Sequence, residues 1–214
     1  MNFEAKKIKE IYEGYLSKKY DFANPPFFKT WKKKACADSS LKNGDLVLVF
    51  CCGTGLDFPY ILDKIGNNGK IIGIDFSSEM LKKAEEKIKK KKWTNIELIN
   101  TDITNFKNKL TKKADVGICT LGMSIIPDYK SAYYNLLSNV KKQGEIIIGD
   151  MQLATGLLAC FNPLTIFLSR KFGGTHEGHH NSLKLCSLMK NELLDVRKRE
   201  FFFGSYYYCI GSKI

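Results

Sequence analysis

Short runs of consecutive apolar residues alternate along the chain with longer segments in which apolar residues recur every three or four positions. The first clear run is Leu46–Phe50, and similar runs end at Asp75, Asn100, Leu121 and Asp150. A parallel strand that is covered by helices on both faces is apolar throughout, whereas the intervening segments have the period of amphipathic helices. The pattern therefore predicts an α/β fold with a doubly wound, mostly parallel sheet.

Capping and turn residues fall between these runs. We expect helices over residues 57–65 and 182–192, N-caps at Ser77 and Asp128, a turn at Gln143–Gly144 into the fifth strand, and a final pair of strands about Gly204–Ser205.

Glycines and acidic residues follow the predicted strands where a ligand of an open α/β sheet would bind. Gly53 and Gly55 stand between the first strand and the first helix and let the backbone approach a ligand closely. Asp75 ends the second strand and is placed to accept ribose hydroxyls, which suits NAD and S-adenosylmethionine equally. Phe58 replaces the third glycine of a dinucleotide-binding loop, and Asp102 supplies a second acid after the third strand. These two features favour S-adenosylmethionine.

The chain resembles class I S-adenosylmethionine-dependent methyltransferases, in particular the ubiquinone and menaquinone type, whose relatives include phosphatidylethanolamine N-methyltransferase-like proteins. The matching segments are FCCGTG at 50–55, GIDFSSEML at 73–81, WTNIELINTDITNF at 93–106, CTLGMSIIPD at 119–128, VKKQGEIIIGD at 140–150 and, more weakly, KKYDFAN at 18–24. The likeness weakens after Asp150. Val49 stands where the family usually has an acid, and Cys51 replaces the first glycine of the loop.

The resemblance implies a seven-stranded, Rossmann-like sheet with a C-terminal antiparallel hairpin, and S-adenosyl-L-methionine as the cofactor. The predicted cofactor residues are Gly53, Gly55, Asp75 and Asp102 as contacts, with Cys51, Cys52, Phe76, Met80, Ile103 and Thr120 lining the site. We expect a single domain over 1–214, with a helical cover at 1–40 and an apolar, histidine-rich insertion at 151–181.

The segment 151–169 is almost uncharged, but Asn162–Pro163 interrupts it, so we do not expect it to span a membrane. The favoured interpretation is an internal helix or lid over an apolar substrate. The alternative is a surface that dips into a bilayer beside Arg170 and Lys171.

All three histidines, His176, His179 and His180, fall within five residues that we expect to form a loop after Gly173–Gly174. His179, His180 and Tyr20 are the candidates for removing a proton from an acceptor, and an inert loop is the alternative. The spacing lacks a third ligand, so no metal site is expected.

The tetrapeptide Asn24–Phe27 matches a motif of adenine amino-methyltransferases, but it does not follow a predicted strand.

The net charge of +12 favours an acidic partner such as anionic lipid, a phosphate-bearing substrate or nucleic acid, although lysines in runs such as 87–93 are also explained as a solvated surface. Seven cysteines without a C-x-x-C pair suit core positions in a reducing compartment. The charged start of the chain does not resemble a signal peptide. We therefore expect a cytoplasmic protein, with peripheral membrane contact as a second interpretation.

The favoured function is methyl transfer to a small, apolar or lipid-like acceptor, preferably at an amine nitrogen. A quinone-type ring carbon is the first alternative. RNA methylation is another, although no appended RNA-binding module is recognisable and nucleic acid is not the expected partner. Val49, Cys51 and the lack of histidines after the fourth strand leave a non-catalytic, cofactor-binding regulator open.

Overall fold

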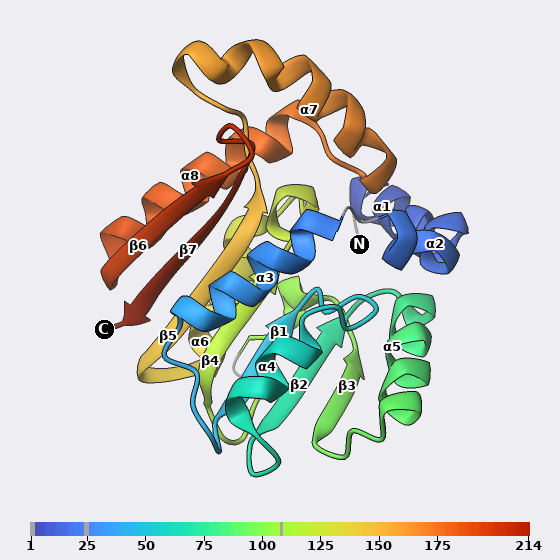
Figure 1. The fold of residues 1–214 in the computed structure, drawn as a ribbon, viewed down its shortest axis with the longest axis vertical. Coiled ribbons are helices and arrows are strands. Elements are labelled where there is room, and N and C mark those ends of the chain that lie inside the picture. Colours follow the sequence, from blue (N-terminus) through green and yellow to red (C-terminus); the bar gives the residue numbers. More distant parts are fainter. Residues whose placement is uncertain (1–2, 24–25, 108) are drawn as a thin grey trace.

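The computed structural model describes residues 3–23, 26–107 and 109–214 (Figure 1). The elements are α1 (Phe3–Glu13), α2 (Tyr15–Ala23), α3 (Pro26–Asp38), β1 (Leu46–Phe50), α4 (Phe58–Ile65), β2 (Lys70–Asp75), α5 (Ser78–Lys91), β3 (Ile96–Asn100), η1 (Ile103–Asn105), β4 (Ala114–Thr120), η2 (Met123–Ile125), α6 (Tyr129–Asn139), β5 (Val140–Met151), η3 (Gly156–Phe161), α7 (Asn162–Ser169), η4 (Arg170–Phe172), α8 (His176–Glu192), β6 (Leu193–Phe201) and β7 (Tyr206–Lys213).

The strands form one seven-stranded sheet in the order β3-β2-β1-β4-β5-β7-β6. The first five strands are parallel, and β7 runs antiparallel to both β5 and β6. The predicted α/β sheet with a C-terminal antiparallel hairpin is therefore confirmed. The point where the chain reverses its winding lies between β1 and β4, at the carboxyl ends of the parallel strands.

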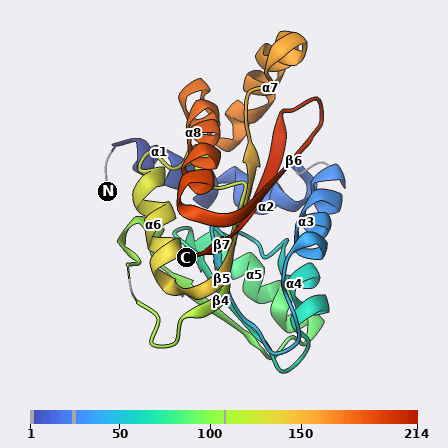
Figure 2. The ribbon, with the colours of Figure 1, turned by 90° about the vertical axis from the view of Figure 1, so that its left-hand side faces the viewer.

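Helices cover both faces of the sheet (Figure 2). In β1, Val47 and Val49 pack with α3, α4 and α5, whereas Leu48 and Phe50 pack with α6 and α8. Alternate residues of a strand point to opposite faces, so a strand between two helical layers has to be apolar at every position. This is the physical reason why the run at 46–50 shows no polar alternation.

The predicted caps at Ser77 and Asp128 are present, each accepting a hydrogen bond from a backbone N–H of the following helix. The predicted turn before the fifth strand is different. Gln143, with φ of 60°, and Gly144 lie within β5, where six residues (Val140 to Glu145) oppose three residues of β4 (Ala114 to Val116). The turn residues thus form an irregularity inside one longer strand.

The histidine segment is helical, so the predicted loop is wrong. Thr175 caps α8 by accepting a hydrogen bond from the Gly178 N–H at 2.9 Å, and the helix begins at His176. A Cβ at Gly178 would lie 1.9 Å from the Ser124 carbonyl oxygen. The glycine therefore permits close packing of α8 on η2.

The apolar segment after β5 is not an internal helix. No residue of η3 is buried, and only Thr165 and Ser169 of α7 are. In Figure 1 this segment stands above the carboxyl ends of the parallel strands, and one side of α7 covers a cavity described below. The segment is therefore a cover with an exposed outer side. Among the described residues, no helix is both long and apolar enough to cross a bilayer.

The predicted helical cover at the N-terminal end of the chain begins with two helices, α1 and α2, that meet at Gly14. Tyr12 and Leu16 are buried with Met80 of α5, and the Tyr12 hydroxyl donates to the Phe172 carbonyl at 3.0 Å.

The first half of the Asn24–Phe27 motif, residues 24 and 25, lies outside the described residues, and Pro26 begins α3.

Candidate functional site

A cavity of about 270 Å³ opens at the carboxyl ends of β1, β2 and β3. Five of the predicted cofactor residues line it: Cys51, Asp75, Phe76, Asp102 and Ile103. Its other lining residues come from α1, from η1, and from the end of η2 and the segment that follows it: Ile8, Thr104, Asn105, Ile125, Ile126, Pro127 and Asp128. We refer to it as the cofactor cavity.

Asp75 links the end of β2 to the glycine loop. One carboxylate oxygen accepts from the Gly53 N–H at 2.8 Å and the other from the Ser77 N–H at 3.0 Å. Burial raises the pKa of Asp75 to about 6, and the backbone N–H groups of Ser77, Gly53 and Phe76 partly oppose this increase. Each oxygen retains a second lone pair, so the carboxylate can still accept hydroxyl groups from a ligand.

The other five predicted cofactor residues do not line this cavity. Gly53 and Gly55 have positive φ (53° and 75°), and a Cβ at Gly55 would lie 2.5 Å from the Phe58 ring, so they shape the loop. Cys52 and Met80 are buried behind it. Their assignment as cofactor residues therefore stays a prediction.

Thr120, the fifth, belongs to a buried polar cluster behind the loop. The Lys32 ammonium of α3 lies 2.7 Å from an Asp57 carboxylate oxygen and also donates to the Thr120 hydroxyl. The Thr120 hydroxyl donates to the same oxygen of Asp57 at 2.7 Å. All three residues are at least 95% buried. This cluster ties α3, the start of α4 and the end of β4 together next to the glycine loop.

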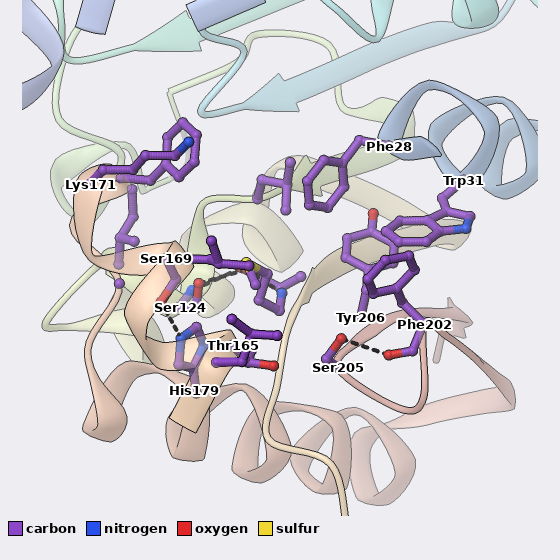
Figure 3. A pocket seen from close by; sticks show the side chains of 18 of the residues that line it. Phe28, Trp31, Ser124, Thr165, Ser169, Lys171, His179, Phe202, Ser205 and Tyr206 are labelled. Carbon is purple, nitrogen blue, oxygen red and sulfur yellow. Dashed lines mark hydrogen bonds between the residues drawn. The ribbon is translucent and has the colours of Figure 1, made fainter. Parts of the chain in front are cut away.

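A second cavity, of about 320 Å³, lies above β4 and β5 (Figure 3). Aromatic rings form one wall: Trp31 stacks on Tyr206 with the ring centroids 4.4 Å apart, and Phe28 and Phe202 pack edge-on against Trp31. Residues of α7 form the cover. Ile125 lines both cavities, so a group held in the cofactor cavity lies next to this apolar cavity.

A buried carboxyl group and a buried imidazole face the apolar cavity. Asp150, 1% exposed, accepts from the Ser124 hydroxyl at 2.6 Å and from the Ser124 N–H at 2.8 Å, and burial raises its pKa. His179, also 1% exposed, lies across the cavity from the aromatic wall with its Nε2 2.8 Å from the Ser169 hydroxyl (Figure 3). Burial lowers the pKa of His179.

The structure brings only part of the predicted proton-transfer set to this cavity. His179 and Tyr20 line it, whereas His180 is exposed and lines neither cavity. No three His, Cys, Asp or Glu side chains gather as metal ligands in the described part of the chain.

Sequence reasoning missed several residues of these cavities. No sequence pattern identifies Trp31 or Lys32 as a site residue, and the pattern predicts Asp150 only as the end of a strand. Asp150 carried a usable signal, because it is a third acid at the end of a parallel strand. The aromatic wall had none, since Trp31 and Tyr206 are 175 positions apart in sequence.

Comparisons with known proteins agree with this geometry. The family model described as "Methyltransferase domain" matches residues 41–179. A demethylmenaquinone methyltransferase from Alkalihalophilus pseudofirmus is 28% identical over 170 residues, covering 77% of this chain and 70% of the relative. One from Staphylococcus saprophyticus is 32% identical over 154 residues, covering 68% of this chain and 63% of the relative. About a third of each relative thus lies outside the match.

Solved structures share the fold. Magnesium protoporphyrin IX methyltransferase from Synechocystis with bound S-adenosylhomocysteine matches with a TM-score of 0.71 at 14% identity, covering 98% of this chain and all of that one. A SAM-dependent methyltransferase from Aquifex aeolicus matches with a TM-score of 0.67 at 19% identity over 92% of this chain and 98% of that one. With a carboxylate pair facing a cavity beside a glycine loop, the residues present fit S-adenosylmethionine. The chain therefore belongs to the methyltransferase domain family of class I, S-adenosylmethionine-dependent enzymes.

Proposed function

We propose that this protein transfers a methyl group from S-adenosylmethionine to a ring carbon of an apolar quinol. The observation that carries the proposal is the pair of adjoining cavities: a polar one with Asp75 and Asp102, and an apolar, aromatic-walled one, with Ile125 between them. The names of the relatives, demethylmenaquinone methyltransferases, favour a ring carbon over the amine nitrogen that sequence analysis preferred.

The apolar cavity suits a flat, fused ring. Trp31 and Tyr206 offer stacked aromatic surface, and Phe28 and Phe202 extend it. The cover formed by α7 limits the access of water to the cavity. It also encloses the acceptor, which holds the acceptor in a fixed position relative to the methyl donor. When bound, S-adenosylmethionine supplies a methyl group that its sulfonium already activates, so the protein mainly has to position the acceptor and remove a proton.

His179 is the residue we propose for accepting the proton of a ring hydroxyl. We assign the Ser169 hydroxyl as the donor to the Ile166 carbonyl at 3.0 Å, and with this assignment Nε2 of His179 donates to the Ser169 hydroxyl. The Nδ1 atom is then the basic one, and it has no hydrogen-bond partner among the described residues. Removing the hydroxyl proton makes the neighbouring ring carbon nucleophilic. After that carbon has accepted the methyl group it loses its own hydrogen as a proton, the ring oxygen regains a proton, and the aromatic ring is restored.

The acceptor is tested by offering labelled S-adenosylmethionine to the purified protein with three substrates: reduced demethylmenaquinone, phosphatidylethanolamine and total RNA. We expect label in the reduced quinone alone, and none when the same quinone is supplied oxidised, because the oxidised ring is not a nucleophile. Label in the lipid amine or in RNA contradicts the proposal. Label nowhere, with S-adenosylhomocysteine still binding, favours the non-catalytic regulator.

The role of His179 is tested by comparing His179→Ala with His180→Ala at saturating S-adenosylmethionine. We expect His179→Ala to lower kcat by about 10²–10⁴, the usual contribution of a general base, and His180→Ala to leave it within about twofold, since His180 lines neither cavity. Because only neutral His179 accepts a proton and its pKa is lowered, kcat should fall with acid only below pH 6.5. Equal kcat for both variants, or an unchanged pH profile in His179→Ala, rules out the role.

A further inference from the structure

The mouth of the apolar cavity is surrounded by exposed apolar side chains, which we call the apolar rim. The rim consists of Leu157, Leu158, Phe161, Leu164, Phe167 and Leu168 from η3 and α7, with Phe202 and Phe203 from the β6-β7 turn. Leu157 is 96% exposed and Phe167 68% exposed. The rings of Phe161 and Phe203 stack 5.4 Å apart, so the two segments form one continuous surface.

The rim continues into the cavity. Phe161, Leu164, Leu168, Phe202 and Phe203 are exposed on the surface and also line the apolar cavity. An apolar acceptor would therefore meet mainly apolar side chains between the surface and the aromatic wall. Of the ionisable residues Asp150, Lys171 and His179 that also line the cavity, Lys171 is the exposed one (Figure 3). Leaving so many large apolar groups in water is unfavourable, which marks the rim as a contact surface.

The charge around the rim indicates what it contacts. No acidic residue occurs between Asp150 and Glu177, or after Glu200, while Arg170 and Lys171 follow α7 directly and are both exposed. A positively charged border attracts an anionic surface. A second copy of this chain would present the same apolar rim with the same cations, and the net charge of +12 on each copy opposes their association.

We propose that the apolar rim docks on the interface of a bilayer that contains anionic lipid, and that the apolar cavity opens towards the acyl chains. Leu157 and Phe167 enter the headgroup and acyl boundary, and Arg170 and Lys171 lie at the level of the lipid phosphates. This inference rests on the proposed function in that it supplies a route for a lipid-like acceptor. Its test measures docking directly and requires no methyl transfer.

The test is vesicle co-sedimentation of the full chain with phosphatidylcholine alone and with phosphatidylcholine containing 30% phosphatidylglycerol. The variant is Leu157→Asp/Phe167→Asp, because neither residue lines the cavity. The matched control is Leu194→Asp, a 52% exposed leucine at the opposite end of β6. We expect wild type and Leu194→Asp to bind the anionic vesicles, less so at high salt, and the double variant to bind at least about tenfold more weakly, since charges oppose insertion.

A second measurement detects lipid close to the rim through tryptophan fluorescence. In a Trp93→Phe protein the remaining tryptophan is Trp31, whose ring lies 5.8 Å from that of Phe202 in the rim. Brominated lipids in the anionic vesicles should quench it, and Leu157→Asp/Phe167→Asp should abolish the quenching. Wild type that remains in the supernatant, equal binding by the double variant and wild type, or a rim-dependent dimer in sedimentation equilibrium without vesicle binding, overturns the proposal.

Discussion

Replacing Asp75 by alanine is expected to weaken binding of S-adenosylhomocysteine at least a hundredfold in titration calorimetry. The predicted contacts are two hydrogen bonds from ribose hydroxyls to a charged acceptor, each contributing about 1.5–3 kcal/mol. The change also removes the acceptor of the Gly53 N–H, which leaves the loop without its 2.8 Å anchor. Both losses lower the affinity of the cofactor cavity for S-adenosylhomocysteine.

The matched control is Asp63→Asn, which changes the same charge on the exposed side of α4. It should bind S-adenosylhomocysteine as wild type does. Near-wild-type affinity of Asp75→Ala would show that the carboxylate does not hold the adenosine moiety, and the assignment of the cofactor cavity would be wrong.

The affinity for S-adenosylhomocysteine should also depend on pH in a defined direction. The pKa of Asp75 is about 6 without ligand, and accepting hydroxyl groups favours the ionised form. Ligand binding therefore lowers this pKa and releases a proton at acid pH. The association constant should be flat above about pH 6 and fall about tenfold per pH unit below it. Asp75→Asn should lose this dependence, and a wild-type association constant that stays constant down to pH 4.5 contradicts it.

Replacing Lys32 by methionine is expected to lower the free energy of unfolding by about 3–5 kcal/mol, because it leaves the Asp57 carboxylate buried without its counter-charge. The Lys32 and Asp57 side chains are each only 6% exposed and lie 2.7 Å apart. Urea denaturation followed by circular dichroism measures the change.

Lys34→Met on the same helix is the control. Its ammonium lies 3.9 Å from the Asp38 carboxylate, the lysine side chain is 42% exposed, and the loss should be about 0–1 kcal/mol. The double variant Lys32→Met/Asp57→Leu should recover at least half of the lost stability, because removing both charges removes the penalty. A double variant less stable than Lys32→Met would show that Asp57 stabilises the fold through contacts other than its pair with Lys32, such as the hydrogen bond from Thr120, and would contradict this explanation.

Five of the ten predicted cofactor residues line the cofactor cavity, so the position of this cavity in the fold was predictable from sequence. Asp75 and Asp102 end strands that the apolar runs identify, and parallel strands bring their carboxyl ends to one edge of a sheet. Periodicity and capping depend on near neighbours, so Ser77 and Asp128 were also placed correctly. The histidine segment was misread because glycines at 173, 174 and 178 resemble a loop. Gly178 lacks a Cβ and therefore allows α8 to pack closely against the Ser124 carbonyl. This contact is between distant segments, and no local sequence pattern predicts it.

By itself the sequence determined the α/β class, the parallel strands, the glycine loop and the two acids of the cofactor cavity, since each depends on residues close together in the chain. Only the tertiary structure decided the rest. The packing of Trp31 on Tyr206, the burial of Lys32 against Asp57, the turn of His179 into the apolar cavity and the joining of Phe161 to Phe203 are contacts between distant segments. Such contacts depend on the position and orientation in which the helices pack against the sheet. The periodicity of apolar residues along one segment does not specify either of these.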